Sequence, residues 1–104
     1  MVNFVNCCLH PIALNDGRLF QPSGTVARVA ATFGDFDEFD VCQQGFGAVE
    51  GLPEPQEGTV FIVSALVLGA LNGSRPDVVA PASGHPLAKR DGGNVVSVPG
   101  FVRL

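Results

Sequence analysis

The chain has 104 residues, of which 46% are hydrophobic and 15% charged, so we expect one domain with a single core rather than a disordered chain. The net charge is −4 and only six residues are basic, which argues against binding to DNA or RNA polymers, because that affinity comes from many Lys and Arg contacts to phosphate. Thirteen glycines and eight prolines predict many turns, and the short Val-rich and Phe-rich runs between them favour strands over helices.

The N-terminal sequence and the cysteines favour a cytoplasmic protein. The opening "MVNFVNCCLHP" has no basic region, and Asn and His interrupt its apolar positions, so no signal peptide is expected. Three cysteines are an odd number, and Cys7 and Cys8 are adjacent, so free thiols are expected rather than a disulfide framework. The longest apolar run, residues 59–71, is shorter than the roughly 20 residues of a membrane-spanning helix, so no transmembrane segment is expected.

In the first third of the chain, strands are expected to alternate with turns. Residues 2–9 form a mixed apolar stretch that predicts a first strand, which His10 and Pro11 end. The sequence "NDG" at residues 15–17 lies between apolar pairs and predicts a hairpin, since Asn and Gly accept positive φ. After a turn at "QPSG", alternation over residues 25–33 predicts another strand.

Residues 34–40, "GDFDEFD", alternate acidic residues with phenylalanines, a pattern typical of a solvated loop or hairpin tip that its phenylalanines hold in place. Three Asp and one Glu are oxygen ligands in principle, but they lack the Asp-x-Asp-x-Asp-Gly order of an EF-hand loop, so no calcium site is expected. Gly45 and Gly47 then predict a turn before a short strand at residues 48–50.

The segment from residue 52 to residue 73 carries the strongest local signals. Prolines fix the backbone over residues 52–56, which predicts a rigid extended segment outside any central strand. The β-branched and aromatic run "TVFIV" at residues 59–63 predicts a central strand. Ser64 is a candidate N-cap and Asn72-Gly73 a left-handed C-cap, which together predict a helix of about two turns.

That helix has almost no polar face, so it is expected to be buried on most sides, either across the sheet or in a subunit contact. Residues 74–81, "SRPDVVAP", predict a further strand, and residues 91–93 predict a turn between two more. The expected fold is mainly β (β-rich α+β): one domain over residues 1–104, with a small curled antiparallel sheet, a barrel or a sandwich, and one short helix.

Four stretches carry a resemblance to known proteins: "NCCLHPIAL", "PSGTVARV", "GLPEPQEGTVFIVSALV" and "RPDVVAP". In these, and over most of its length, the chain resembles a family of small uncharacterised proteins from bacteriophages, prophages and actinobacterial genomes. It departs from the family at Cys7-Cys8, where a Leu-Thr type pair is more usual, and in lacking a Cys near the C-terminus. The resemblance implies a phage setting and no assigned activity. The positions that match its motifs are Asn6, His10, Ser23, Gly24, Arg28, Glu54, Gln56, Ser64, Arg75 and Asp77.

The residues give little support to catalysis or metal binding. Cys8 and His10 are two apart and would share a face of a strand, but a buried thiol and a strand-ending His explain the same pattern. Zinc needs about four ligands, and the cysteines form no Cys-x-x-Cys pair. "GFGAVEG" lacks the lysine and the long following helix of a phosphate loop. We therefore expect no catalytic residue, metal or cofactor.

A sparse basic set in an acidic chain suits a small anionic, nucleotide-like ligand better than a polymer. Glu54 and Gln56 would hydrogen-bond a base or sugar while Arg28 or Arg75 neutralises a phosphate. Turn and helix-start donors complete the candidate ligand-binding set, which is Ser23, Gly24, Arg28, Glu54, Gln56, Ser64, Arg75 and Asp77. The alternative is structural: Arg75 pairs with Asp77, Arg28 lies on a solvated face, and the prolines only shape a turn.

Three functions are compatible with these features. The first is a phage-type binding module that sequesters a nucleotide immune signal and so counters host defence in the host cytoplasm. The second is an interaction or assembly protein of a phage, which would form homo-oligomers through the apolar helix. The third is a small nucleotide-acting enzyme. No membrane partner is expected in any of them.

Overall fold

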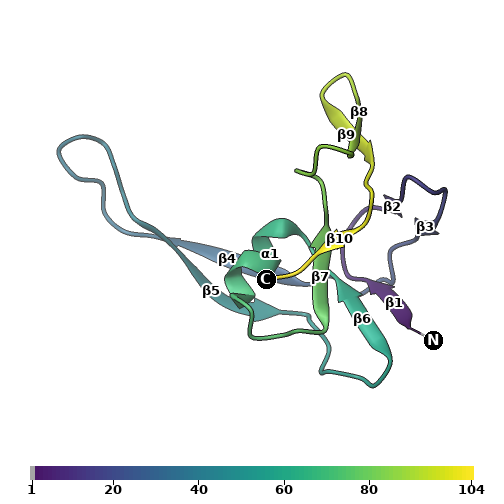
Figure 1. Cartoon of the computed structure of the whole chain (residues 1–104). Helices are drawn as coiled ribbons and strands as arrows, with labels where there is room; N and C mark the ends of the chain where they lie inside the picture. The colour runs from purple at the N-terminus through teal and green to yellow at the C-terminus, as the bar shows by residue number, and fades with distance from the viewer. Residues whose placement is uncertain (1) are drawn as a thin grey trace.

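The chain folds around a four-stranded mixed sheet. The computed structural model describes residues 2–104, and its central sheet has the order β1 (Asn3–Asn6), β6 (Thr59–Ile62), β7 (Val78–Pro81) and β10 (Phe101–Val102). Strands β1, β6 and β7 run parallel, whereas β10 is antiparallel to β7 (Figure 1). The predicted central strand after the proline-rich segment is confirmed, because β6 lies between β1 and β7.

The mainly β, β-rich α+β class is confirmed, since 40% of the chain is strand and 7% is helix. The antiparallel arrangement is wrong for the central sheet, and no sheet within residues 2–104 closes into a barrel. The physical reason is the connection between β6 and β7, which contains the helix α1 (Ala65–Leu71). A helical crossover brings the chain back to the same end of the sheet, so the strands that it joins are parallel.

The helix forms where its capping residues predict it. Ser64 accepts a hydrogen bond from the backbone N–H of Val67 at 3.3 Å, and Asn72 ends the helix in the left-handed conformation with φ of 51°. Val67 and Leu68 are buried, so the helix packs across the sheet, the first of the two predicted placements. The expectation of burial on most sides is wrong, because Leu66 is 53% exposed.

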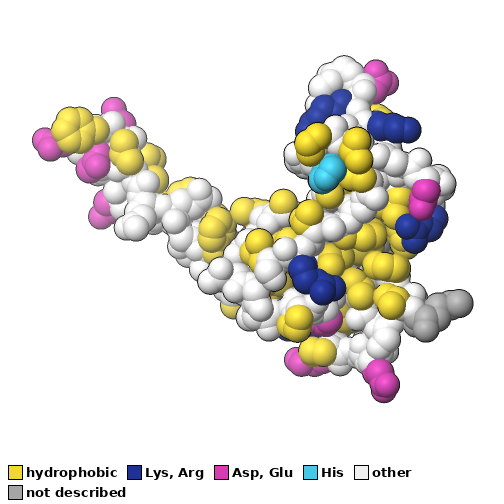
Figure 2. All heavy atoms as spheres, in the orientation of Figure 1, with side chains coloured by type: hydrophobic (Ala, Val, Ile, Leu, Met, Phe, Trp, Pro, Cys, Tyr) yellow, Lys and Arg dark blue, Asp and Glu magenta, His cyan; other side chains and the backbone are white. Residues whose placement is uncertain are grey.

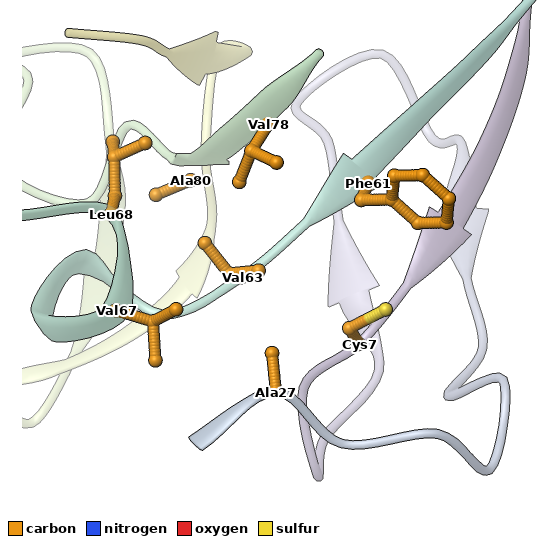
Figure 3. Packing of buried hydrophobic residues seen from close by; sticks show 8 residues of the cluster. All are labelled: Cys7, Ala27, Phe61, Val63, Val67, Leu68, Val78 and Ala80. Atoms are coloured by element: carbon orange, nitrogen blue, oxygen red, sulfur yellow. The ribbon is translucent and has the colours of Figure 1, made fainter. Parts of the chain in front are cut away.

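Side chains alternate across the central sheet and make two hydrophobic clusters. Phe61 and Val63 point to the face that α1 and residues 27–29 cover, whereas Ile62, between them, points to the opposite face. The first cluster consists of Cys7, Ala27, Phe61, Val63, Val67, Leu68, Val78 and Ala80 (Figure 3). The second consists of Ile12, Leu14, Ile62, Val79 and Val98, with a packed aromatic trio of Phe4, Phe20 and Phe101 beside it. Both faces of the sheet are thereby covered.

Two short hairpins contribute to the second cluster, the first through Ile12 and Phe20 and the second through Ala88 and Val95 at its base. The first joins β2 (Ile12–Ala13) to β3 (Leu19–Phe20), and its turn at residues 15–17 is the predicted one. The second joins β8 (Lys89–Asp91) to β9 (Asn94–Ser97) through the predicted turn at residues 91–93. Both turns were predictable because each needs a residue with positive φ, which glycine adopts easily. In the structure Gly17, Gly92 and Gly93 have positive φ.

The third hairpin projects from the rest of the molecule. It pairs β4 (Arg28–Phe33) with β5 (Gln44–Glu50), and Figure 1 shows it extending as an arm away from the other elements. The radius of gyration is 15.5 Å, compared with about 13 Å for a compact domain of this length. The predicted turn at Gly45 and Gly47 is wrong, because both lie in β5, where a Cβ at Gly45 would come within 2.9 Å of the Thr32 hydroxyl.

The predicted acidic hairpin tip is confirmed, but its phenylalanines do not hold it in place. Phe33, Phe36 and Phe39 are 66%, 71% and 76% exposed. The turn is instead held by Asp37, whose Oδ1 accepts hydrogen bonds from the backbone N–H of Phe39 at 2.8 Å and of Val41 at 3.1 Å. Figure 2 shows the result, a tip on which hydrophobic and acidic side chains lie side by side in solvent.

No helix within residues 2–104 has the length and the apolar content needed to cross a bilayer.

Candidate functional site

A groove lies at the carboxyl ends of the three parallel strands. Its walls are residues 7–13, which follow β1, residues 64–67, which follow β6, and Pro81 and Ser83 at the end of β7. Residues 26–29 at the base of the arm and residues 95–98 complete the lining, and the groove has a volume of about 780 Å³. In sheets with parallel strands, ligands characteristically bind outside the carboxyl ends, where the connecting segments diverge.

The lining is mostly apolar and contains a single charged side chain, Arg28. Arg28 is exposed, and within residues 2–104 no carboxylate forms a salt bridge with it. His10, Ser64, Ser83 and Ser97 add polar groups around the same groove. An apolar cavity with a few polar groups and one unpaired positive charge is suited to a ligand that has both an apolar part and an anionic part.

Asn6 shapes the wall that follows β1. Its side chain is almost fully buried; Nδ2 donates hydrogen bonds to the carbonyl oxygens of His10 at 2.9 Å and Phe20 at 3.0 Å, and Oδ1 accepts one from the N–H of Cys8 at 2.9 Å. Its carbonyl oxygen accepts from the Ser23 hydroxyl at 2.7 Å. Asn6 and Ser23 therefore hold the backbone of the groove wall, and their hydrogen-bonding groups are engaged within the protein.

The candidate ligand-binding residues do not form one site. Arg28 and Ser64 line the groove, whereas Ser23 and Gly24 form the turn beside Asn6 and are not among the lining residues. The remaining four, Glu54, Gln56, Arg75 and Asp77, precede β6 or β7 and therefore lie toward the amino end of the parallel strands. The sequence-based set thus divides between opposite ends of the sheet.

At the amino end, the structural alternative for Arg75 is confirmed. Its Nε and Nη2 donate to the two carboxylate oxygens of Asp77 at 2.9 and 2.8 Å, and Nη2 also donates to the carbonyl oxygen of Pro53 at 2.9 Å. The hydrogen bond with Arg75 lowers the pKa of Asp77, and the same bond raises the pKa of Arg75. Arg75 thus fixes the proline-rich segment to the start of β7, while Glu54 and Gln56 are exposed.

Burial disfavours the thiolate form of both cysteines of the groove. Burial raises the pKa of the Cys7 thiol, and burial together with the charge of Cys7 raises the pKa of the Cys8 thiol. The Cys8 thiol donates to the carbonyl oxygen of Ile62 at 3.8 Å, which is a structural contact. In the part of the chain that the structure describes, no three His, Cys, Asp or Glu side chains are grouped to hold a metal ion.

Sequence reasoning identified Arg28 and Ser64 but omitted His10, Ser83 and Ser97 from the ligand set. Ser83 could have been identified from its position in the sequence, because it follows the predicted strand at residues 74–81 and the ends of parallel strands lie together. Ser97 lies on β9, which no local pattern brings to the groove, and its hydroxyl donates to Asn15 Oδ1 at 2.6 Å.

Neither a protein-family model, nor a curated protein, nor a solved structure matches this chain. The resemblance to phage and actinobacterial proteins therefore stays a prediction from the sequence motifs.

Proposed function

We propose that this chain is a binding module that captures a small anionic, nucleotide-like ligand in the groove at the carboxyl ends of β1, β6 and β7. The observation that carries the proposal is Arg28, an unpaired cation at an otherwise uncharged and mostly apolar groove. The volume, about 780 Å³, lies within the range of about 300–1,000 Å³ that small-molecule sites occupy. A planar base would pack on the apolar walls while Arg28 binds a phosphate.

Capture without conversion is the form of the proposal that suits the side chains of the groove. A thiol is nucleophilic as the thiolate, and the raised pKa values of Cys7 and Cys8 keep both protonated at neutral pH. In the phage setting that the sequence motifs imply, a protein of this kind would sequester a nucleotide signal of the host defence. The groove supports the capture of an anionic ligand, and the resemblance supports only the phage setting of that role.

The experiment is a binding assay with a panel of mono-, di- and cyclic nucleotides. Purified protein is titrated by isothermal calorimetry, and the complex is then heat-denatured so that the released compound can be identified. Intact compound in the supernatant supports capture, whereas a chemically altered one indicates an enzyme.

Arg28→Ala tests the assignment of the groove. Losing a charge-assisted hydrogen bond costs about 1.5–3 kcal/mol, which corresponds to an increase in Kd of roughly 10- to 150-fold. Arg103→Ala, which removes an exposed arginine outside the groove lining, is the matched control and should leave Kd unchanged. Ala65→Phe places a large side chain at the groove from an exposed helix position and should block binding. An unchanged Kd in both groove variants would contradict the proposal.

A further inference from the structure

The base of the arm, next to α1 (Figure 1), places one cation and one anion side by side. In the pairing of β4 with β5, Arg28 lies directly opposite Glu50, and both residues are exposed. Directly opposite residues of an antiparallel pair share one face of the ribbon, with Cβ atoms about 5 Å apart. Within residues 2–104 no salt bridge joins the two, so the guanidinium of Arg28 can bind an anion while a carboxylate stays beside it.

The rest of the groove adds no fixed charge. Among the described residues that line it, Arg28 is the only one that is Lys, Arg, Asp or Glu. A phosphate that enters the groove therefore has one guanidinium with which to form a charge-assisted hydrogen bond. Any further negative charge on the ligand would lie against apolar walls without a partner, and near Glu50, and both effects are unfavourable. The groove thus compensates a single negative charge.

Arg90 contacts the same groove wall but has a different role. Its Nη2 donates to the carbonyl oxygen of Ser83 at 2.9 Å, and Ser83 lines the groove whereas Arg90 does not. The next residue in β8, Asp91, is acidic. Arg90 therefore supports the backbone of the wall, and the variants below test whether it also contributes to ligand binding.

We propose that Arg28 and Glu50 together select the charge of the ligand, so that the groove takes a nucleotide with a single negative charge. This inference rests on the proposed function, because it concerns the ligand of the same groove. The compound class with one charge is a phosphodiester of mononucleotide size, such as a cyclic mononucleotide, whereas a terminal phosphate carries nearly two charges at neutral pH. The net charge of the chain, −4, acts in the same direction, because it repels a ligand in proportion to the ligand's negative charge.

The test compares compounds that share a base and a sugar but differ in charge. Adenosine 5′-monophosphate, its methyl ester, cyclic adenosine monophosphate and adenosine diphosphate are each titrated by calorimetry, and the guanosine series is measured in parallel. The buffer is held at about pH 8, where histidine side chains are neutral and a phosphomonoester is fully charged. It contains EDTA, so that no divalent cation offsets the charge of the phosphates.

The methyl ester is the decisive compound, because it keeps the base, the sugar and the phosphate of the monophosphate and has one charge less. The methyl ester and the cyclic nucleotide should bind with a Kd at least roughly 10-fold below that of the monophosphate with the same base. The diphosphate should bind more weakly still.

Glu50→Gln tests the anionic half of the selector. It removes the charge at nearly constant size, so the Kd of the monophosphate should fall more than the Kd of its methyl ester, and the preference should shrink to roughly 3-fold or less. Glu57→Gln is the matched control, because Glu57 is exposed and precedes β6, at the opposite end of the parallel strands from the groove. It should keep the preference of the parent, as should Arg90→Gln.

Circular dichroism verifies that each variant is folded. If the folded parent binds none of these compounds, the proposed function and this inference fail together. If it binds them but equally well at one and two charges, or more tightly as the charge rises, only the charge selection is overturned. An unchanged preference in Glu50→Gln would overturn the role of Glu50. An Arg90→Gln variant that weakens binding of the monophosphate more than that of its methyl ester would show a second ligand-binding cation and overturn the single-charge groove.

Discussion

Replacing Asn6 with alanine should destabilise the fold more than any other substitution of a single polar side chain in the groove wall. The side chain is 2% exposed and makes three hydrogen bonds that link β1, the bend after it and the end of β3. Alanine would leave two carbonyl oxygens and one N–H without these partners. Because a buried group is costly when its partner is removed, the loss is larger than the cavity alone would cause.

The magnitude follows from the three bonds. Each is worth about 0.5–1.5 kcal/mol net, so the free energy of unfolding should fall by about 3 kcal/mol. A domain of this length is stable by about 5–15 kcal/mol, so the change is a large fraction of the total. Asn6→Asp keeps the acceptor for Cys8 but places a carboxylate oxygen against the carbonyl oxygens of His10 and Phe20. Its destabilisation at pH 7 should be at least as large, and it should shrink at pH values near 4, where the carboxyl binds a proton and can donate.

The assay is urea unfolding followed by far-ultraviolet circular dichroism, because the chain has no Trp or Tyr to report by fluorescence. Asn3→Ala is the matched control: it changes the same residue type on the same strand at an exposed position and should shift stability by less than about 0.5 kcal/mol. A loss below about 1 kcal/mol for Asn6→Ala, with the control unchanged, would refute the argument that this side chain holds the groove wall.

Three further predictions concern other parts of the fold. A double-mutant cycle of Arg75→Ala and Asp77→Ala should give a coupling free energy of about 1 kcal/mol at pH 7. Because folding lowers the pKa of Asp77, this coupling should be complete above the unfolded-state pKa of about 3.9 and should be lost as pH falls through the folded-state pKa. A coupling that does not change with pH would contradict the ion pair. Gly51→Ala should lower the melting temperature, because φ at Gly51 is +81° and a Cβ there would overlap a backbone carbonyl. Gly69→Ala should raise the melting temperature, because Gly69 lies in the helix with open space around it and alanine is the better helix former. Equal shifts for the two variants would contradict this reasoning. The Cys7 thiol, 1% exposed, should react with a thiol reagent only on unfolding and more slowly than the other two cysteines, and rapid labelling of the folded protein would contradict its burial.

Local features of the fold were predictable from the sequence where the chain itself imposes them. The turns at residues 15–17 and 91–93 and the caps of the helix depend on φ values and hydrogen bonds within a few residues. The parallel arrangement of β1, β6 and β7 was missed, although one signal was present. A strand, a short helix and a second strand follow one another over residues 59–81, and that order predicts parallel neighbours.

The groove was only half predictable. Arg28 stood out as a cation on a mostly apolar strand, but its proximity to Ser64 depends on how the base of the arm packs beside the helix, which no local pattern specifies. Arg75 and Asp77 looked equally suited to a ligand or to each other, and in the structure they pair with each other, two residues apart and just before β7. The exposed phenylalanines were misjudged for a related reason: amphipathic spacing says which residues are apolar, but not whether another part of the chain lies near enough to cover them.

The parallel pairing of β1 with β6 determines the order in which this chain can fold. Asn3 pairs with Thr59, 56 positions later, so β1 has no partner in the central sheet until the chain has been synthesised as far as β6. The local hairpins and the β6–α1–β7 unit close short loops and can form without it, because loop closure is cheaper and faster over short distances. We therefore expect β1 to dock last on the free edge of β6, and the carboxyl-end groove, which needs the segment after β1 as a wall, to form only at that final step.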